Sequence, residues 1–509
     1  MRIFTNDQIR ELDKITIERY GVPSFSLMEI AGHKVFEQIC KRYKQLRRVF
    51  ILLGKGNNGG DGLVVARQFI LKKIWTTILL TEEIENCSED FKKNFEILNR
   101  VQKEFPYLEA IKYSESDTEV IKLVATESDV IIDALFGTGI KSELKSPYKE
   151  LIQLVNSLGL SDKVISIDIP SGLNGDTGAP MPEAIRASFT LTLGGGKAGL
   201  YSYPGCEFTG EIVIIDIGLP IEGVPPPVIE VTDNEMFHGR LKRGDMNFHK
   251  GDGGHVGIIA GSIYRPGAAY LSALGALKGG AGLITLISER EVIDGVTKLF
   301  PEVMTREIDY NNDSDVYTSK LLSGVDSLVI GPGLPNDEVA VRWIKNIIAT
   351  WDKYMVLDAE ALKIISHIKF NPEKVVITPH PMELSRLINI SKDEIQKDRI
   401  GYCIKCAQTL DCVVLLKGAR SVISKPSADF TINMSGNQFM ASGGMGDLLS
   451  GLIGAFIYQT ESAYDAARLG AYIHGLAGDI AINNGRYPLT ATSVADFIKD
   501  AMIQAKVYE

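Results

Sequence analysis

VFILLGKGNNGGDGL, residues 49–63, is the stretch from which the fold can be read. Its first five residues are apolar and predict a buried β-strand, and an apolar helical pattern begins near Leu63. Between them lie glycines at positions 54, 56, 59, 60 and 62, which allow a tight turn. A strand that passes through a glycine-rich turn into a helix is the building unit of α/β folds, so this fold class is expected.

The same alternation of apolar strands and amphipathic helices extends along the chain and predicts an α/β fold with mostly parallel sheets. The predicted strands are residues 49–53, 77–80, 130–132, 164–167, 189–193, 212–215, 256–259, 283–287, 327–330, 354–357, 375–378 and 413–416. Pro225, Pro226 and Pro227 interrupt the alternation, because successive prolines continue neither a helix nor a central strand. We therefore expect two domains, residues 1–222 and 231–509, joined by a linker over residues 223–230.

The composition argues against several classes of protein. The chain has 509 residues, 45% of them hydrophobic, which is enough for two or three domains with large cores. Its net charge of −10 disfavours a nucleic-acid partner. No apolar run is long enough for a membrane span, and the charged start MRIFTNDQIRELDK does not resemble a signal peptide. The six cysteines form neither a disulfide framework nor a zinc pattern, so a reducing, cytoplasmic setting is expected.

The glycine-rich turn has more than one interpretation. Gly54, Gly56 and Gly59 match the G-x-G-x-x-G fingerprint, so a Rossmann dinucleotide site is one alternative. The acidic residue expected about 20 residues later is not clearly placed, since Glu82 and Glu83 come after that point. A simple strand-to-helix turn is the other alternative, although such a turn does not require so many polar side chains.

Polar side chains stand at the ends of several predicted strands in the first half. Asn58, Asp133, Asp168 and Ser171 all lie at or just after such ends. Because open α/β sheets bind their ligands at the carboxyl ends of the strands, these four side chains are expected to converge. Their oxygen atoms suit a hard cation and a hydroxylated ligand, while the alternative for each aspartate is a helix cap.

Three motifs of the first half resemble the NAD(P)H-hydrate epimerase domain over roughly residues 1–222. They are GNNGGDG at residues 56–62, DALFGTG at residues 133–139, and DIPSG at residues 168–172 with DTG at residues 176–178. The resemblance implies a Rossmann-like three-layer α/β/α domain that binds hydrated nicotinamide nucleotide, with a potassium ion near Asn58, Asp133 and Ser171. We expect Asp168 to handle the proton at C6 of the ring. The implied substrate-binding residues are Asn57, Asn58, Gly59, Gly60, Asp61, Gly137, Thr138, Gly139, Ile140, Lys141, Ser142 and Glu143.

In the second half, SGGMGD at residues 442–447 precedes another apolar helical pattern. Glycines at this point let backbone amides at a helix N-terminus close around an anion. Asp447 cannot itself hold a phosphate, since like charges repel, but it can take a proton from a substrate hydroxyl. The motif therefore suggests phosphoryl transfer, and the alternative is a tight turn in which Asp447 caps the helix.

Two other strand ends of the second half carry groups suited to a ligand site. His380 lies between two prolines, which are expected to stiffen it and leave it no helix to join, so a ligand-facing role is favoured over a packed or capped histidine. Lys417 and Gly418 follow a predicted strand and offer a cation and free amides to phosphate. No G-x-x-x-x-G-K-[ST] motif occurs, so a P-loop enzyme is not expected.

The second half resembles the ribokinase-like ADP/ATP-dependent NAD(P)H-hydrate dehydratase domain, an α/β domain, over roughly residues 228–509. The two halves in this order resemble the bifunctional NAD(P)H-hydrate repair enzymes. Met445 and Met382 stand where the family usually has threonine and glycine. The resemblance implies Asp447 as a catalytic residue, with Gly333 and His380 at the substrate. The implied nucleotide-binding residues are Lys417, Gly418, Ala419, Arg420, Ser421, Gly443, Gly444 and Gly446.

The function implied by both resemblances is repair of hydrated NADH and NADPH (NADHX and NADPHX). One half would interconvert the R and S epimers, and the other would dehydrate the S form after its C6 hydroxyl is phosphorylated by ADP or ATP. Potassium and Mg²⁺ are the expected ions, and a homo-oligomer is expected. The alternatives are a ribokinase-like vitamin or sugar kinase fused to a nucleotide-binding module, a first half that only binds nucleotide, and a dehydrogenase. The choices between ADP and ATP and between NADHX and NADPHX stay open.

Overall fold

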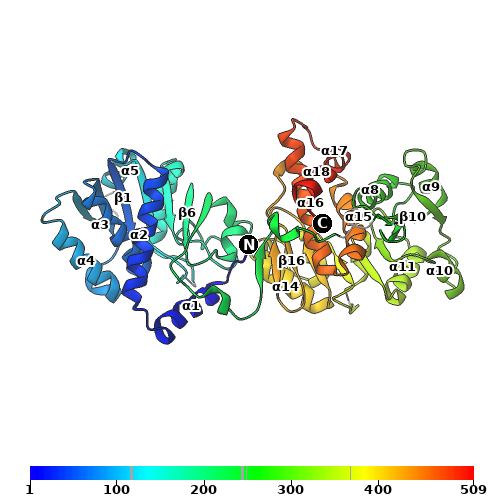
Figure 1. The fold of residues 1–509 in the computed structure, drawn as a ribbon, viewed down its shortest axis with the longest axis horizontal. Coiled ribbons are helices and arrows are strands. Elements are labelled where there is room, and N and C mark those ends of the chain that lie inside the picture. Colours follow the sequence, from blue (N-terminus) through cyan, green and yellow to red (C-terminus); the bar gives the residue numbers. More distant parts are fainter. Residues whose placement is uncertain (115–117, 141, 242–245, 248, 367, 509) are drawn as a thin grey trace. The chain divides into compact units, whose positions relative to one another are not determined.

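The structure, a computed structural model, describes residues 1–114, 118–140, 142–241, 246–247, 249–366 and 368–508. The chain forms two compact units, one made of Arg2–Pro226 and the other of Met1 with Pro227–Glu509. Figure 1 shows the N-terminal unit in blue to green and the C-terminal unit in green to red. None of the described helices is long and apolar enough to cross a membrane.

The N-terminal unit contains a seven-stranded sheet in the order β3-β2-β1-β4-β5-β6-β7, in which all neighbouring strands are parallel. Its strands are β1 (Arg48–Leu53), β2 (Trp75–Leu80), β3 (Leu108–Lys112), β4 (Val130–Ala134), β5 (Val164–Ile167), β6 (Phe189–Leu193) and β7 (Glu211–Ile215). Its α-helices are α1 (Asn6–Lys14), α2 (Ser24–Arg42), α3 (Asn57–Leu71), α4 (Glu89–Val101), α5 (Thr118–Glu127), α6 (Tyr148–Ser157) and α7 (Ala198–Tyr201).

Helices cover both faces of this sheet, because successive side chains of a strand point to opposite sides. Ile51 of β1 belongs to a core shared with α2, α3 and α4. Its neighbours Phe50 and Leu52 belong to a second core shared with α5 and α6. The sheet is therefore the middle of three layers, as the family resemblance implies.

The C-terminal unit contains a ten-stranded sheet in the order β11-β10-β9-β12-β13-β14-β15-β16-β17-β8. β16 is antiparallel to both of its neighbours, and the other pairs are parallel. The strands are β8 (Ile229–Val231), β9 (His255–Ile259), β10 (Leu283–Ser288), β11 (Met304–Glu307), β12 (Ser327–Ile330), β13 (Tyr354–Leu357), β14 (Val375–Ile377), β15 (Val413–Leu416), β16 (Val422–Ser424) and β17 (Phe430–Ile432). The α-helices are α8 (Pro266–Lys278), α9 (Arg290–Val296), α10 (Asp315–Leu321), α11 (Glu338–Thr350), α12 (Pro381–Ile388), α13 (Lys392–Lys397), α14 (Arg399–Leu410), α15 (Met445–Thr460), α16 (Ala463–Asn483), α17 (Ala491–Ala495) and α18 (Ile498–Gln504).

Small residues bring α8 and α15 into contact through their backbones. A Cβ atom at Gly275 of α8 would lie 2.1 Å from the carbonyl oxygen of Leu448, and one at Gly451 of α15 would lie 1.9 Å from that of Ser272. Only glycine fits at such a separation. Both helices share a core with alternate residues of the sheet. This packing holds the N-terminus of α15, which follows the glycines of SGGMGD, close to the sheet.

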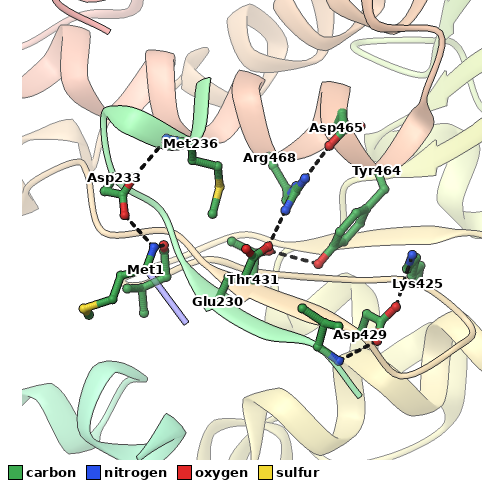
Figure 2. Close-up of polar contacts among 12 residues, drawn as sticks. Met1, Glu230, Asp233, Met236, Lys425, Asp429, Thr431, Tyr464, Asp465 and Arg468 are labelled. Atoms are coloured by element: carbon green, nitrogen blue, oxygen red, sulfur yellow. Dashed lines mark hydrogen bonds and ion pairs between the residues drawn. The ribbon is translucent and has the colours of Figure 1, made fainter. Parts of the chain in front are cut away.

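Polar contacts tie the edge strand β8 to the rest of the C-terminal unit (Figure 2). Arg468 of α16 donates a hydrogen bond of 2.7 Å to Glu230 of β8 and also pairs with Asp465. On the neighbouring strand β17, Thr431 shares a hydrogen bond of 2.9 Å with Tyr464. The boundary between the units lies between Pro226 and Pro227, and the last two residues of the predicted linker belong to β8.

Each strand predicted from the sequence is present. The structure adds β3, β8, β11, β16 and β17, which the hydrophobic pattern does not predict. β3 and β11 are mostly exposed strands at sheet edges, so they lack a run of buried apolar residues. β8, β16 and β17 have only three residues each, too few for a periodic pattern.

Candidate functional site

A cavity of about 920 Å³ opens in the N-terminal unit at the carboxyl ends of β1, β4, β5 and β6. Of the residues that the sequence assigns to a substrate, the structure places most along this cavity. They are Asn57, Asn58, Asp61, Gly137, Thr138, Gly139, Ile140, Ser142 and Glu143, joined by Asp168. Lys141 lies outside the described residues. The structure therefore brings together side chains from α3, the loop after β4 and the turn after β5, as expected for strand ends.

Gly59 and Gly60 do not line the cavity but shape the turn that forms it. A Cβ atom at Gly59 would lie 1.8 Å from the carbonyl oxygen of Gly54, and one at Gly60 would lie 2.6 Å from the side chain of Met28. Gly54 in turn approaches the backbone of Leu135, where a Cβ atom would lie 1.8 Å from the carbonyl oxygen. These glycines let the end of β1, the start of α3 and the end of β4 meet at one place.

Asn58 and Asp133 offer oxygen atoms that suit a cation. Asn58 donates its amide to the carbonyl oxygen of Ile167 at 3.2 Å, and its buried Oδ1 atom has no hydrogen-bond partner. Asp133 is fully buried and forms no ion pair within the described part of the chain. Its carboxylate accepts hydrogen bonds from the backbone of Ser171 and the hydroxyl of Ser166, both at 2.8 Å, and Ser171 donates its hydroxyl as well.

The charge of Asp133 has an unusual setting. Burial raises the pKa of its carboxyl, and the hydrogen bonds from Ser171 and Ser166 lower it. An unpartnered amide oxygen and a buried carboxylate that forms no ion pair within the described residues fit a hard monovalent ion. The described residues contain no group of three or more His, Cys, Asp or Glu side chains arranged for a metal, which leaves this mixed oxygen set as the candidate.

Asp168 follows β5 in a left-handed backbone conformation with φ of +69°, which is uncommon for a residue other than glycine. Its Oδ1 atom accepts hydrogen bonds from the ammonium group of Lys197 and, at 3.2 Å, from the backbone of Leu193. Its Oδ2 atom lies close to Gly137, where an added Cβ atom would be 2.8 Å away. Asp168 therefore faces the Gly137–Glu143 loop with one oxygen and an internal ammonium with the other.

Lys197 and Asp13 also line the cavity, although the sequence predicts a site role for neither. Lys197 is fully buried and is held by Asp168, by the Thr192 hydroxyl at 3.0 Å and by the Leu193 carbonyl at 2.7 Å. Lys197 directly follows three glycines at the end of a predicted strand, and this position in the sequence could have indicated a site residue. Asp13 lies on α1, far from any motif, and no local pattern marks it.

Burial changes the protonation of two carboxyl groups in this cavity. It raises the pKa of Asp13 to about 6; the Lys197 ammonium lowers this pKa, and the Asp168 carboxylate raises it further. Burial also raises the pKa of Asp61 well above its ordinary value, and the charges of Asp168 and Asp13 add to this rise. The cavity thus combines an ion pair, Asp168 with Lys197, and carboxyl groups that hold protons more strongly than in water.

A second group of candidate residues lies at the N-terminus of α15 in the C-terminal unit. Gly444 caps this helix with φ of +88°, and a Cβ atom there would lie 2.4 Å from Leu271, so the position requires glycine. Asp447 lies in the first turn. Burial raises the pKa of Asp447 to about 6; the Asp358 carboxylate raises this pKa further, and the Lys417 ammonium lowers it. The structure shows no capping hydrogen bond from Asp447 within its described residues, so the helix-cap alternative is not observed.

Asp358 connects Lys417 to α15. The ammonium of Lys417 donates a hydrogen bond of 2.6 Å to Asp358 Oδ1, and the hydroxyl of Ser450 donates one of 2.6 Å to Oδ2. A Cβ atom at Gly446 would lie 3.2 Å from the Lys417 ammonium, so this cation faces the glycine loop. The sequence predicts no role for Asp358 in a site. Nothing in its local sequence indicates a pairing with a lysine 59 positions later.

The Lys417–Ser421 loop contains two residues with positive φ, Gly418 at +137° and Arg420 at +52°. The hydroxyl of Ser421 donates to the Gly418 carbonyl at 3.0 Å, and Arg420 donates to the Met434 carbonyl at 2.7 Å. The fully buried Arg399 lies against Gly418, where a Cβ atom would be 2.9 Å from its guanidinium. The loop therefore has cationic groups close to its backbone. Ala419 and Arg420 form the turn of this loop.

Gly333 and His380 were both expected at the substrate. Gly333 has φ of +65° and lies against Arg265, the residue before α8. His380 is the N-cap of α12: its Nδ1 atom accepts from the backbone of Met382 at 3.1 Å and of Glu383 at 3.3 Å. The expectation that the prolines leave His380 no helix is wrong, because a proline is compatible with the first position of a helix. A ligand contact of His380 stays a prediction.

The six cysteines are free, as the sequence predicts, and burial raises the pKa of Cys403 to about 12. At neutral pH the Cys403 thiol therefore stays protonated.

Comparison with known proteins matches both parts of the chain. Residues 256–500 match the family described as NAD(P)H-hydrate dehydratase, and residues 24–199 match the family described as YjeF-related protein N-terminus. The bifunctional NAD(P)H-hydrate repair enzyme of Moorella thermoacetica is 34% identical over 98% of this chain and 96% of its own length. The enzymes of the same description from Coxiella burnetii and Escherichia coli are 32% and 34% identical and cover 95% and 93% of this chain, with 95% and 88% of their own lengths matched.

Among solved structures, the ADP/ATP-dependent NAD(P)H-hydrate dehydratase of Bacillus subtilis, co-crystallized with ATP and Mg²⁺, is 30% identical. It covers 54% of this chain, with 98% of its own chain matched, at a TM-score of 0.49.

Proposed function

The chain belongs to the family of bifunctional NAD(P)H-hydrate repair enzymes, and on this premise we propose how its two units divide the work. It is an enzyme that repairs hydrated NADH and NADPH. We assign the interconversion of the R and S epimers to Arg2–Pro226 and the nucleotide-dependent dehydration to Pro227–Glu509. A vitamin or sugar kinase fused to a nucleotide-binding module is not favoured, because relatives of this family match both units.

The dehydration assignment depends on one observation, the position of Asp447 in the first turn of α15 beside Lys417 and Asp358. Hydration of the nicotinamide ring leaves a hydroxyl group on C6, which is a poor leaving group at neutral pH. Phosphorylation converts it into a good leaving group. Asp447 is the proposed base that takes the hydroxyl proton while ADP or ATP transfers a phosphoryl group to the oxygen. Loss of phosphate then restores the dihydropyridine ring.

The groups around Asp447 support this chemistry. Backbone amides of the Gly443–Gly446 loop lie at a helix N-terminus, where partial positive charge stabilises a transferring phosphoryl group. The ammonium of Lys417, fixed by Asp358, adds a full positive charge beside Gly446. We expect Mg²⁺ to arrive with the nucleotide phosphates and to keep several waters, so we assign no side chain to it. The Lys417–Ser421 loop is the proposed contact for the nucleotide.

In the N-terminal unit we propose that the substrate occupies the cavity and that Asp168 exchanges a proton at its C6 hydroxyl. Lys197 holds one oxygen of Asp168, so the other is left for the substrate. Asn58, Asp133 and Ser171 would hold a potassium ion, which would supply positive charge for the anionic substrate. The unpartnered Oδ1 atom of Asn58 and the buried charge of Asp133 support this proposal.

A direct assay tests both assignments on the full chain. An epimer mixture of NADHX is incubated with ADP or ATP, the recovered absorbance of reduced nicotinamide is followed, and the epimers are separated by chromatography. We expect complete conversion of both epimers, in contrast to half conversion by a pure S-specific dehydratase. A stable phosphorylated hydrate as the end product would contradict dehydration and favour a kinase. The homo-oligomer and the cytoplasmic location stay predictions, which sedimentation and fractionation would test.

A further inference from the structure

Among the charged side chains that line the cavity of the N-terminal unit, three carboxyl groups and one ammonium group come from four separate elements. Asp13 comes from α1, Asp61 from α3, Asp168 from the turn after β5 and Lys197 from the loop after β6. Lys197 pairs directly with Asp168, so this cation is already matched. Asp13 and Asp61 form no ion pair within the described residues, and burial disfavours the charged form of both carboxyl groups.

The electrostatics therefore separate these groups into two kinds. Asp168 forms an ion pair with Lys197 through Oδ1, and its Oδ2 atom lies toward Gly137. Burial raises the pKa of Asp13 to about 6, and it raises the pKa of Asp61 well above its usual range. A carboxylate that is paired with a cation and a carboxyl group that burial keeps protonated are suited to opposite roles. The first is suited to act as a base and the second as an acid.

Inversion at C6 of the hydrated ring needs both roles. The C6 hydroxyl is attached to a carbon that is also bonded to the ring nitrogen. It can leave as water if its oxygen receives a proton while the nitrogen lone pair forms a double bond to C6. A water molecule must then attack C6 from the opposite face and lose a proton. The departing and the entering oxygen lie on opposite faces of the ring, so two proton-transfer groups, one for each oxygen, would serve the two steps.

We propose that Asp13 is the second proton-transfer residue of the epimerase site and acts as the acid partner of Asp168. This inference rests on the epimerase function proposed for the N-terminal unit. The Asp13 carboxyl gives its proton to the departing C6 oxygen, the C6–O bond breaks, and the ring nitrogen supplies the electron pair. Water forms the new C6–O bond from the other face, and its proton passes to the free oxygen of Asp168. Exchange with solvent returns both carboxyl groups to their starting states.

The other carboxyl groups of the cavity fit this role less well. Asp61 is only 7% exposed, and its strongly raised pKa means that it retains its proton. Asp90 already accepts a hydrogen bond of 2.6 Å from Ser24 and pairs with Lys93. Glu143 is exposed to solvent, where water satisfies its charge. Asp13 is half-buried, so it can both reach the cavity and recover a proton from solvent.

The test replaces Asp13 in the full chain and follows the loss of the R epimer of NADHX, prepared by hydrating NADH. Asp13→Asn should lower kcat for epimerisation about a hundredfold or more, the contribution of general acid catalysis, and should change KM little. Asp13→Glu should restore part of the rate, because it keeps the acid. Glu11→Gln makes the same acid-to-amide change at an exposed position of α1 and should have no effect.

Dehydration of the S epimer by the same molecules checks that the C-terminal unit is intact, and a circular-dichroism spectrum and thermal unfolding curve like those of the parent check the folding of the N-terminal unit, which contains Asp13. If the parent chain does not interconvert the epimers, the proposed function of the N-terminal unit fails. If the parent does so and Asp13→Asn keeps its kcat, the role of Asp13 is refuted while the epimerase function stands. A higher KM with unchanged kcat, or a rate that Asp13→Glu does not raise above that of Asp13→Asn, would also refute it, because either indicates a merely structural role.

Discussion

Lys417 donates a hydrogen bond of 2.6 Å to Asp358, and this contact joins the loop after β15 to the end of β13. Ser450 of α15 donates to the other oxygen of Asp358 at 2.6 Å, so the ion pair is also attached to the helix that carries Asp447. Lys417 is thereby fixed beside the glycine loop and neutralises Asp358. Lys417 therefore does not pair with Asp447, whose carboxylate stays available as the base in the proposed phosphoryl transfer.

Replacing Asp447 by Asn should abolish dehydration and spare epimerisation. The change keeps the size of the side chain but removes the proton acceptor, so we expect a loss of about a thousandfold or more in kcat. Asp500→Asn, at an exposed position of α18, is the matched control. The measurement is recovery of reduced nicotinamide from the S epimer. Turnover near that of the parent would show that Asp447 has only a structural role.

The rate of dehydration should fall as the pH is lowered through about 6. Burial raises the pKa of Asp447 to about 6, and a base works only when it is ionised, so protonation below this pH removes activity and the rate levels off above it. Asp358 contributes to the raised pKa. In Asp358→Asn the acid limb should therefore move to lower pH. A profile of kcat against pH for both proteins checks this; a limb that stays in place would contradict the coupling.

Replacing Asp133 by Ala should make epimerisation insensitive to potassium and leave dehydration of the S epimer intact. Asp133 is the only carboxylate among the three proposed ligands, so its loss removes most of the attraction for a cation. Initial rates are compared at several potassium concentrations, with a constant ionic strength. Equal stimulation of the variant and the parent would show that the ion binds elsewhere.

Two glycines of one loop offer a paired test of Asp168. A Cβ atom at Gly137 would lie 2.8 Å from Asp168 Oδ2, whereas one at Gly139 would meet nothing within 4 Å. Gly137→Ala should therefore displace the carboxylate and slow epimerisation by about tenfold or more, since small displacements of catalytic groups are costly. Gly139→Ala should leave the rate close to that of the parent. Equal rates for both variants would mean that the position of Asp168 Oδ2 does not matter.

His380 can be tested separately as a cap and as a ligand contact. His380→Ala removes both functions, and loss of the cap should cost about 1 kcal/mol of stability. His380→Asn keeps a capping side chain but lacks the Nε2 atom. If His380 contacts the hydrate, both variants should raise KM for the hydrate and leave KM for the nucleotide unchanged. A raised KM in the alanine variant alone would assign His380 to the cap.

Much of the fold could be predicted from the chain because buried parallel strands have a strong local signature. β1, β4 and β5 are almost continuous runs of buried apolar residues, and each was expected. β3 and β11 lie at sheet edges and are largely exposed, so they lack that signature. The helix after His380 differs from the prediction for another reason: proline is expected to end a helix, but Pro381 stands at the first helical position, where proline is compatible with a helix.

The site residues that belong to motifs could also be predicted from the sequence, because glycines and carboxylates at the ends of predicted strands form recognisable local patterns. This is how Asp168, Asn58 and Asp447 became candidates. Their partners were decided by the tertiary structure alone. Asp13 reaches the cavity from an N-terminal helix, and Asp358 meets Lys417 from 59 positions away. Protonation depends on burial and on distances between charges from separate elements, so it is a property of the packed chain and not of any local stretch.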